Sequence, residues 1–448
     1  MRQNGAMTDT AVTRLQALLR LPTISRQNLE ETEWAVFDEF VALLPSLYPA
    51  VHSNLERELV NGHSMLYRWR GRSEGPATVL MAHYDVVPAS EEGWAHPPFA
   101  AELVGEGEEQ LIWGRGTLDD KGSLASVLEG VEAQLGAGHS PEHDVYLSFG
   151  HDEETFGGGA SAIVDLLESR GVRPGLVIDE GGAVVEDIFP GVSGPIAVVG
   201  VSEKGILSLE LSVDQHGGHP STPPKVTATV RLARAIVRLN GRPFRSGFSA
   251  PTIEMIRTLG AHARGPLRFV FTTLWLTKPL LLVLFRRLSD ETAAMIRTTQ
   301  AVTQLSGSQG ANVLAERAVA TVNIRVAIDS SVAETIEHVR RAINDPLVSI
   351  DVLHPSEPSP VSPTNGAAWE LVKSTIEETF PGTIVTPYVM MAASDSRHYT
   401  RISQHVYRFS PFEMSTEERG TLHAMNERMR VATFLRGVDF YTRLVGKL

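Results

Sequence analysis

The chain has 448 residues, of which 42% are hydrophobic and 21% are charged, a composition typical of folded proteins with room for two domains. Its formal net charge of -13 argues against a nucleic-acid partner, because phosphates are bound by basic surfaces. The chain has no cysteine, so disulfides and thiolate metal ligands are excluded, and any metal must bind His, Asp or Glu.

Up to about residue 203, strand-like apolar runs alternate with helical patterns. The runs at 77–81, 145–149 and 175–178 are typical of buried strands, and the segment 124–135 repeats apolar side chains with helical spacing. Such alternation predicts an α/β fold in which helices cover both faces of a mainly parallel sheet.

From residue 205 the pattern changes to the period-two alternation of an antiparallel sheet. We expect strands at 206–213, 318–326 and 348–353 and helices at 226–239 and 332–343, followed by a proline-rich return linker and a helix at 369–380. These elements predict an inserted α+β domain of ferredoxin-like type. The expected boundaries are 1–203 and 357–448 for a discontinuous first domain and 204–356 for the insertion.

Two segments bear on where the protein acts. The polar amino terminus, through residue 9, lacks the apolar core of a secretory signal, so we expect a cytoplasmic protein. The apolar stretch 266–288 contains Arg268, Lys278 and Pro279, whereas a membrane span needs about 20 predominantly apolar residues, so we expect no stable span. This stretch has two open interpretations: lid core or subunit interface, or an entrance for a fatty acyl chain.

Residues of the kinds that bind metals follow five strand-like runs. His83 and Asp85 follow 77–81, Asp119 follows 113–118, Glu153 and Glu154 follow 145–149, Asp179 and Glu180 follow 175–178, and His423 follows 405–409. In open α/β sheets the functional crevice lies beyond the carboxyl ends of the strands. We therefore expect these side chains to converge.

The converging residues suit two zinc ions, which hydrolases hold about 3.5–4 Å apart with a bridging carboxylate. The expected ligands are Asp119 as the bridge, His83 and Asp179 on one ion, and Glu154 and His423 on the other. Glu180 competes with Asp179 for its place. Cobalt and manganese ions accept the same ligand types, so the ligands alone do not select zinc.

Two further carboxylates have supporting roles. Asp85 lies two residues after His83 and can accept a hydrogen bond from the ring nitrogen that binds no metal, which fixes the tautomer of the ring. Glu153 is the candidate general base, which takes a proton from the attacking water and passes it to the leaving amine. A single polar residue at a strand end is more often a solvated loop residue, so the prediction depends on the five clusters together.

Five motifs carry a resemblance to a known family. They are His-Tyr-Asp-Val-Val-Pro at 83–88, Trp-Gly-Arg-Gly-Thr-Leu-Asp-Asp-Lys-Gly at 113–122, Gly-His-Asp-Glu-Glu at 150–154, Asp-Glu-Gly-Gly at 179–182 and His-Ala-Met-Asn-Glu at 423–427. They resemble the motifs of the di-zinc aminoacylase and carboxypeptidase S family of metallopeptidases, over nearly the whole chain. The segments 202–205, 218–221 and 395–397 are most similar to the branch of carboxypeptidase S and the N-fatty-acyl-amino-acid synthase/hydrolases.

The resemblance implies the same ligands and base, a cis peptide bond between Asp119 and Asp120, a catalytic first domain, and an insertion that serves as a lid or dimerisation domain. His219 would reach the oxyanion, often in the site of a partner subunit, which implies a homodimer. Asn312 and Arg325 would grip the substrate, and Arg325 offers a planar fork to an α-carboxylate. Arg397 is a second candidate for binding a carboxylate, with a surface ion pair to Asp395 as the alternative.

Together these observations predict a zinc-dependent amidohydrolase or exopeptidase that cleaves an amide bond next to a free carboxylate. The substrate would be an N-acyl-amino acid, with a fatty or a short acyl group, or the carboxyl-terminal residue of a short peptide. A dipeptidase is one alternative. A non-catalytic binder of amino-acid conjugates is another, and such a binder would be expected to lack the base or a metal ligand.

Overall fold

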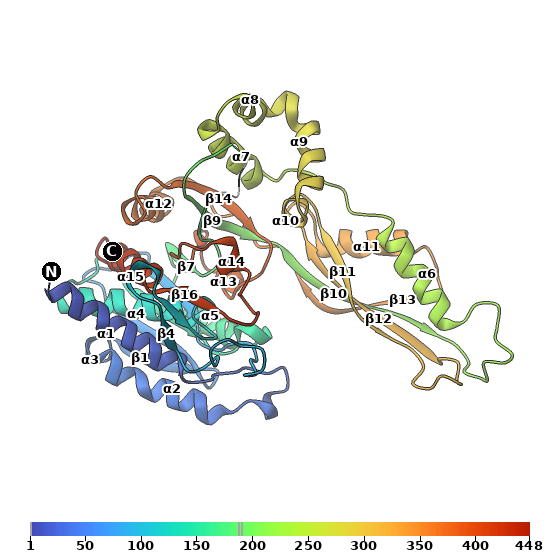
Figure 1. Cartoon of the computed structure of the whole chain (residues 1–448), viewed down its shortest axis with the longest axis horizontal. Coiled ribbons are helices and arrows are strands. Elements are labelled where there is room, and N and C mark those ends of the chain that lie inside the picture. The colour runs from blue at the N-terminus through green and yellow to red at the C-terminus, as the bar shows by residue number, and fades with distance from the viewer. Residues whose placement is uncertain (1, 187–188, 190) are drawn as a thin grey trace.

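The computed structural model describes residues 2–186, 189 and 191–448, with side chains from residue 9 onward. The cytoplasmic prediction was made from the amino-terminal segment, and Met1, the first residue of that segment, lies outside the described residues. An α/β body holds a nine-stranded sheet, and an elongated second part holds a four-stranded sheet (Figure 1). β9 (Ile196–Glu203) and β10 (Gly205–Asp214) are consecutive, so the chain passes directly from the large sheet into the small one.

The large sheet is mainly parallel. Its strand order is β1 (Glu56–Val60), β2 (Ser64–Trp69), β6 (Val145–Gly150), β3 (Thr78–His83), β7 (Leu176–Asp179), β15 (Val406–Arg408), β9 and β14 (Ile384–Met390), with β8 (Val184–Val185) paired to β9. The neighbours from β6 to β15 are parallel, as are β9 and β14, whereas β1, β2 and β8 join antiparallel and β15 pairs antiparallel with β9. The predicted fold class is confirmed.

Helices cover both faces of this sheet because its central strands are apolar on both sides. On β3, Leu80 and Ala82 belong to one apolar cluster, and Val79 and Met81 belong to another. The first cluster includes α1 (Arg2–Leu19), α2 (Trp34–Leu47), α3 (Pro49–Asn54), α4 (Lys121–Gly136), α12 (Ala367–Thr379) and α15 (Val431–Val445), and the second includes α5 (Gly159–Ser169) and α13 (Ser396–Tyr399).

Shorter elements complete the body. They are a three-stranded sheet of β4 (Glu102–Val104), β5 (Leu111–Trp113) and β16 (Arg428–Arg430), the single-turn helices η1 (Leu29–Glu31), η2 (Gly107–Glu109) and η3 (Glu153–Thr155), and α14 (Thr416–Arg419).

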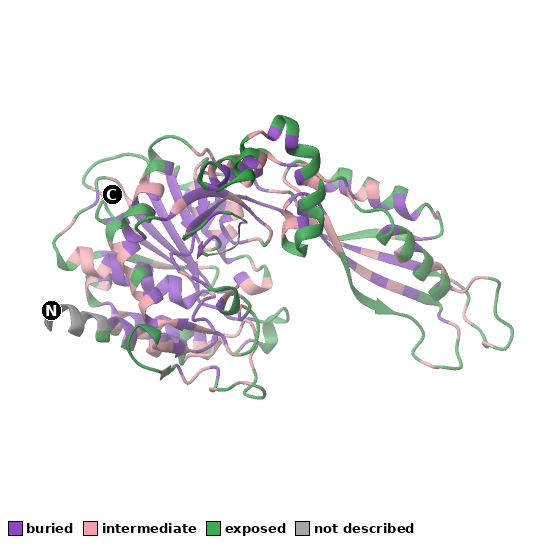
Figure 2. Cartoon of the chain, turned by 45° about the horizontal axis from the view of Figure 1, so that its top comes forward, coloured by how far each residue is buried: buried purple, intermediate pink, exposed green. Residues whose placement is uncertain are grey.

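The second part has the predicted ferredoxin-like order. It runs β10, α6 (Ala228–Asn240), β11 (Thr299–Ser306), β12 (Arg317–Val326), α11 (Val332–Ile343) and β13 (Ser349–Ser356), with antiparallel strands in the order β11-β12-β10-β13. Alternate side chains of β10 and β12 form a core with α6 and α11. The other face of this sheet is more exposed (Figure 2). The exact domain boundaries stay a prediction.

Four helices lie between α6 and β11 and pack against the body. They are α7 (Ala250–His262), α8 (Pro266–Thr272), α9 (Leu274–Leu288) and α10 (Asp290–Met295). α7 contacts β14, and Phe271, Leu281 and Phe285 belong to the core cluster of the large sheet. Phe271 contacts Phe189 of the body, whereas Phe285 contacts Phe248 of the insertion. The buried side chains of 266–288 therefore pack on both parts, and the lid-core and subunit-interface interpretations stay predictions.

Candidate dinuclear metal site

Three neighbouring strand ends supply the first group of site residues. β3 lies between β6 and β7, and all three run in the same direction, so their carboxyl ends meet at one edge of the sheet. β3 ends with His83, β6 leads into Glu153 and Glu154 of η3, and Glu180 directly follows β7. The predicted convergence of these segments is confirmed.

Asp119 and His423 reach the site from loops, contrary to the expectation that each follows a strand. β5 ends at Trp113 in the separate three-stranded sheet, and the chain then turns through Gly116, whose φ of 88° is one that glycine adopts without strain. His423 lies in a loop after α14, with a φ of 57°. The strand prediction for 113–118 was wrong because glycine-rich turns interrupt its apolar residues. The peptide bond between Asp119 and Asp120 is cis, as the resemblance implied.

The loop that carries Asp119 is held by Glu427, a residue to which the sequence analysis assigned no role. The fully buried Glu427 carboxylate accepts hydrogen bonds from the backbone N–H groups of Gly116 at 3.0 Å, Leu118 at 2.9 Å and Asp119 at 3.3 Å. Its other oxygen lies 2.5 Å from Arg115 Nη1. Glu427 thus ties the Asp119 loop to the His423 loop. The signal for this role was the position of Glu427 within the 423–427 motif.

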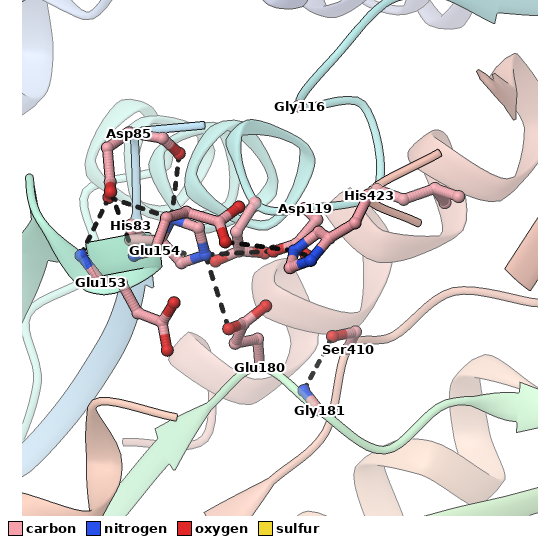
Figure 3. Close-up of polar contacts among 12 residues, drawn as sticks. His83, Asp85, Gly116, Asp119, Glu153, Glu154, Glu180, Gly181, Ser410 and His423 are labelled. Carbon is pink, nitrogen blue, oxygen red and sulfur yellow. Dashed lines mark hydrogen bonds and ion pairs between the residues drawn. The ribbon is translucent and has the colours of Figure 1, made fainter. Parts of the chain in front are cut away.

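Asp119 lies between two histidines and offers one oxygen to each. Asp119 Oδ1 is 3.1 Å from His83 Nε2, and Asp119 Oδ2 is 2.8 Å from His423 Nε2 (Figure 3). Glu154 Oε2 approaches the same atom of His423 at 3.1 Å, and Glu180 Oε1 approaches His83 Nε2 at 3.5 Å. The arrangement therefore has two halves, each with one histidine and one carboxylate, and a shared carboxylate between them.

The structure places Glu180, and not Asp179, in the half of the site that contains His83. Asp179 Oδ2 accepts a hydrogen bond from the backbone N–H of Ser396 at 2.9 Å, which directs this carboxylate away from the histidines. Because successive side chains at the end of β7 point to opposite sides, only one of the two acids can face the site. The assignment of Asp179 is thus corrected in favour of the competitor that the sequence left open.

Asp85 is held where it can orient His83. Its Oδ1 lies 3.2 Å from His83 Nδ1, the ring nitrogen that faces away from Asp119. Ser25 Oγ donates to Asp85 Oδ2 at 2.6 Å, and the backbone N–H groups of Glu153 and Glu154 donate to the same carboxylate at 3.2 and 3.1 Å. These bonds hold the pKa of Asp85 below its usual value against the effect of burial. Sequence reasoning missed Ser25, which lies far from the motifs.

The carboxylate of Glu153 faces the same space (Figure 3). It groups with His83 and Glu180, with one potential ligand atom of each within 4.8 Å of the others, and Figure 3 shows its carboxylate on the side of His83 where Glu180 lies. Burial raises the pKa of Glu153 well above its usual value, and the charges of nearby carboxylates add to this effect. A carboxylate in such surroundings readily takes up a proton.

The donor set and its electrostatics fit two divalent cations. Four carboxylates share a buried space, and burial together with Asp119 raises the pKa of Glu180 to about 8. Hydrogen bonds to Asp119 and Glu154 raise the pKa of His423 to about 10. Glu154 Oε1 is buried and has no hydrogen-bond partner among the described residues. Cations would satisfy this oxygen and offset the repulsion among the acids.

The two arginines expected to bind a carboxylate, Arg397 and Arg325, lie near each other. Arg397 Nη1 is buried without a hydrogen-bond partner in the described part of the chain, and its guanidinium lies 5.4 Å from the centre of the Phe156 ring. Burial raises the pKa of Asp395 to about 8 and the charge of Arg397 opposes this rise, so the two groups interact and the ion-pair alternative stays open. Burial and the charge of Arg397 lower the pKa of Arg325, so the two guanidinium groups are close enough to interact.

His219 and Asn312 lie together at the opposite end of the second part. Each belongs to an exposed loop, one between β10 and α6 and one between β11 and β12, and both loops extend away from the body (Figure 1). The loops are joined by a hydrogen bond of 2.9 Å from Leu314 N to Gly218 O. His219 Nδ1 pairs with Ser221 Oγ at 2.8 Å. Within one chain, therefore, the structure does not bring these two residues to the metal site.

Comparisons with known proteins agree with this geometry. Residues 79–447 match the model of peptidase family M20/M25/M40. The chain is 37% identical to a probable carboxypeptidase S-like protein of Dictyostelium discoideum over 93% of this chain and 79% of that protein. It is 36% identical to an N-fatty-acyl-amino acid synthase/hydrolase of Xenopus tropicalis, over 96% of this chain and 84% of that protein. A family M20 metallo-carboxypeptidase of Sulfolobus solfataricus superposes with a TM-score of 0.71, 17% identity and coverage of 97% and 98%.

Proposed function

The chain belongs to peptidase family M20/M25/M40, and from that membership we propose that the group around Asp119 is a dinuclear zinc centre. The protein is a hydrolase of amide or peptide bonds, as its relatives among carboxypeptidases and N-acyl-amino-acid hydrolases support. One observation carries the proposal for the metal centre: the two oxygens of Asp119 face two different histidines.

We propose that His83 and Glu180 hold one ion, that Glu154 and His423 hold the other, and that Asp119 lies between the ions. When bound, two divalent cations would lower the pKa of the attacking water and would polarise the scissile carbonyl. Zinc suits this set of nitrogen and oxygen donors, and cobalt or manganese are expected to substitute for it.

The residues of the chain then move the proton and hold the geometry. Glu153 removes a proton from the attacking water and delivers it to the leaving amine, which its raised pKa favours. Asp85 keeps His83 in the tautomer that presents Nε2 to the site, because its backbone carbonyl oxygen at 3.1 Å and its carboxylate at 3.2 Å both face Nδ1 and can accept its proton. Glu427 holds the Asp119 loop through three backbone N–H groups.

We propose that the substrate carries a free carboxylate beside the scissile amide. Arg397 is the main candidate for binding it, because Arg397 Nη1 is a buried donor without a partner among the described residues. Arg325 adds a second positive charge nearby. This arrangement suits the release of an amino acid from an N-acyl-amino acid or from the carboxyl end of a short peptide.

An apolar cavity favours an N-acyl-amino acid over a short peptide as the substrate. The cavity has a volume of about 300 Å³ and lies between α7, α9, α10 and β14. Tyr388 lines it, and Met390, two residues further along β14, packs on Gly181 beside the ligand candidate Glu180. Because each buried methylene contributes roughly 0.8 kcal/mol, a fatty acyl chain in this cavity would bind well.

The proposal includes a homodimer in which His219 and Asn312 of one subunit complete the site of the other. The support is their exposed position at the far end of the second part, together with the family resemblance. A cytoplasmic location stays a prediction from the sequence.

The test compares wild-type protein with the Glu153→Gln variant, both loaded with zinc. Release of free amino acid is measured from N-oleoyl-phenylalanine, N-acetyl-phenylalanine and Gly-Phe. We expect Glu153→Gln to lower kcat by roughly 10²–10⁴ at unchanged metal content, because a general base contributes about that much. The exposed residue Glu106 provides the control, because Glu106→Gln makes the same change outside the site. Full activity of Glu153→Gln would refute the assigned base.

A series of acyl lengths tests the proposed cavity. We expect kcat/KM for N-acyl-phenylalanine to rise with each added methylene until the cavity is full. A flat or falling series would exclude an acyl site there and would favour the peptide substrate.

A further inference from the structure

The helices α8 and α9 expose an unusual number of large apolar side chains. The exposed fractions are 59% for Phe269, 85% for Trp275, 56% for Leu276, 61% for Leu280, 45% for Val283 and 49% for Leu288. The opposite side of α9 buries Leu274, Leu281 and Phe285 within the molecule. α9 is therefore apolar on its packed side and also on much of its outer side, whereas a surface helix normally presents polar residues to water.

The charge of this region is opposite to that of the whole protein. From residue 255 to residue 289 the chain contains no Asp or Glu, although its formal net charge is -13. The segment carries six exposed basic residues: Arg257, Arg264, Arg268, Lys278, Arg286 and Arg287. None of the six forms an ion pair with another residue that the structure describes.

The outer side of these helices lies where a large flat partner could reach it. Figure 1 shows α8 and α9 projecting from the body at the edge of the molecule, and Figure 2 shows much of their surface exposed. A bend of 105° separates the two helices. Among the described residues no single helix is long and apolar enough to cross a membrane, although this bent pair reaches that length and composition together.

We propose that the outer side of α8 and α9 docks the protein onto the surface of an anionic lipid bilayer. Apolar side chains with a Trp among them, flanked by Lys and Arg, are the features of helices that lie in the plane of a membrane interface. Trp275 and Leu280 insert among the acyl chains. Arg286 and Arg287, at the end of α9, extend their charged groups to the lipid phosphates.

Charge favours an anionic bilayer over a second copy of the chain as the partner of this face. A symmetric dimer through the same face would bring two sets of six unpaired basic residues together, which repulsion disfavours. An anionic bilayer instead attracts each of these charges, and its apolar interior accepts the exposed side chains. The docking proposal does not depend on the proposed substrate, although Leu284 and Leu288 of α9 also line the apolar cavity.

The test is flotation of the full-length protein with lipid vesicles. We expect co-flotation with an equimolar mixture of phosphatidylcholine and phosphatidylglycerol, weaker binding in high salt, and none with phosphatidylcholine alone. The double variants Trp275→Ser/Leu280→Ser and Arg286→Glu/Arg287→Glu should each lower the bound fraction by about tenfold or more, because each removes one of the two attractions.

Matched controls change the same residue types elsewhere on the surface. Val237→Ser/Leu305→Ser removes two side chains that are 71% and 68% exposed. Arg234→Glu/Arg245→Glu reverses two exposed arginines that form no ion pair with another described residue. These controls should float like wild type, and all variants should keep the wild-type unfolding temperature. Absence of wild type from the anionic vesicles, or equal binding by the α9 variants and the controls, would overturn the proposal. Self-association that requires Trp275 would identify a second copy as the partner instead.

Discussion

At the scale of single residues, the choice between Asp179 and Glu180 shows how finely the backbone sets the metal site. Both are acids, and both follow the apolar run of β7, so sequence alone left them as competitors. The structure separates them because Asp179 accepts a hydrogen bond from Ser396 N, whereas Glu180 approaches His83. The amino-acid sequence does not reveal that the backbone N–H of Ser396 is the donor, since every residue other than proline has such a group.

Substitution of each acid separates their roles. We expect Glu180→Ala to lower the affinity for the metal ion beside His83 by more than about a hundredfold, because a ligand is lost. Asp179→Asn should lower this affinity by no more than about tenfold. Metal content after dialysis against a weak chelator, measured by mass spectrometry, distinguishes the two. If Asp179→Asn loses a metal ion and Glu180→Ala keeps both, the corrected assignment is wrong.

The histidine pKa shifts predict how metal affinity depends on pH. Hydrogen bonds that His423 donates to Asp119 and Glu154 raise the pKa of His423 to about 10, and burial raises the pKa of Glu180 to about 8, so both groups hold protons at pH 7. A metal ion must displace these protons, so apparent affinity should rise between pH 6 and pH 8 by about tenfold per pH unit for each proton released.

Calorimetry of zinc binding measures this release directly. At pH 7, titrations in two buffers of different ionisation enthalpy should give different heats, and the difference reports the number of protons released. His423→Ala should release fewer protons than wild type. Identical heats in both buffers would contradict the coupling between these residues and the metal.

At the scale of elements, regular segments could be predicted from sequence and irregular ones could not. α11 occupies 332–343 as predicted, because a helical apolar stripe follows Ser331, whose side chain accepts a hydrogen bond from Glu334 N. The run 113–118 was predicted as a strand, yet its conformation is set by Glu427, more than three hundred residues later in the chain. Local periodicity carries no information about such a partner.

Removal of Glu427 should therefore damage both stability and metal binding. Glu427→Ala leaves Arg115, which is 3% exposed, without its ion partner, and we expect a loss of about 3–5 kcal/mol in the free energy of unfolding. The matched control is Glu337→Ala, which breaks an exposed pair with Arg340 and should cost less than about 1 kcal/mol. Urea unfolding of both variants measures the difference. Equal losses would show that the buried pair does not hold the Asp119 loop.

At the scale of the whole molecule, the sequence predicted the two sheets but not how the segments between them pack. Its alternating patterns were sufficient for the parallel sheet and the ferredoxin-like part, because each pattern reports which faces are buried. The apolar segment 266–288 could not be placed, since the partner of an apolar face is decided only by the assembled fold. Its buried residues pack on both the large domain and the insertion.

The loops that carry His219 and Asn312 extend away from the body at the end of the second part (Figure 1), and this position leads to a prediction about assembly. The test uses a dimer of one Glu153→Gln chain and one His219→Ala chain. If His219 acts in the site of the partner subunit, this dimer contains one intact site. That site combines Glu153 of the His219→Ala chain with His219 of the Glu153→Gln chain. Heterodimers purified through two different affinity tags should then have about half of wild-type activity, although each homodimer is inactive.

The control pairs Glu153→Gln with the double variant Glu153→Gln/His219→Ala. This heterodimer should have no activity, because neither chain has the base. If the first heterodimer stays inactive, His219 does not act across the interface. Activity in the His219→Ala homodimer would instead show that the site does not need this histidine.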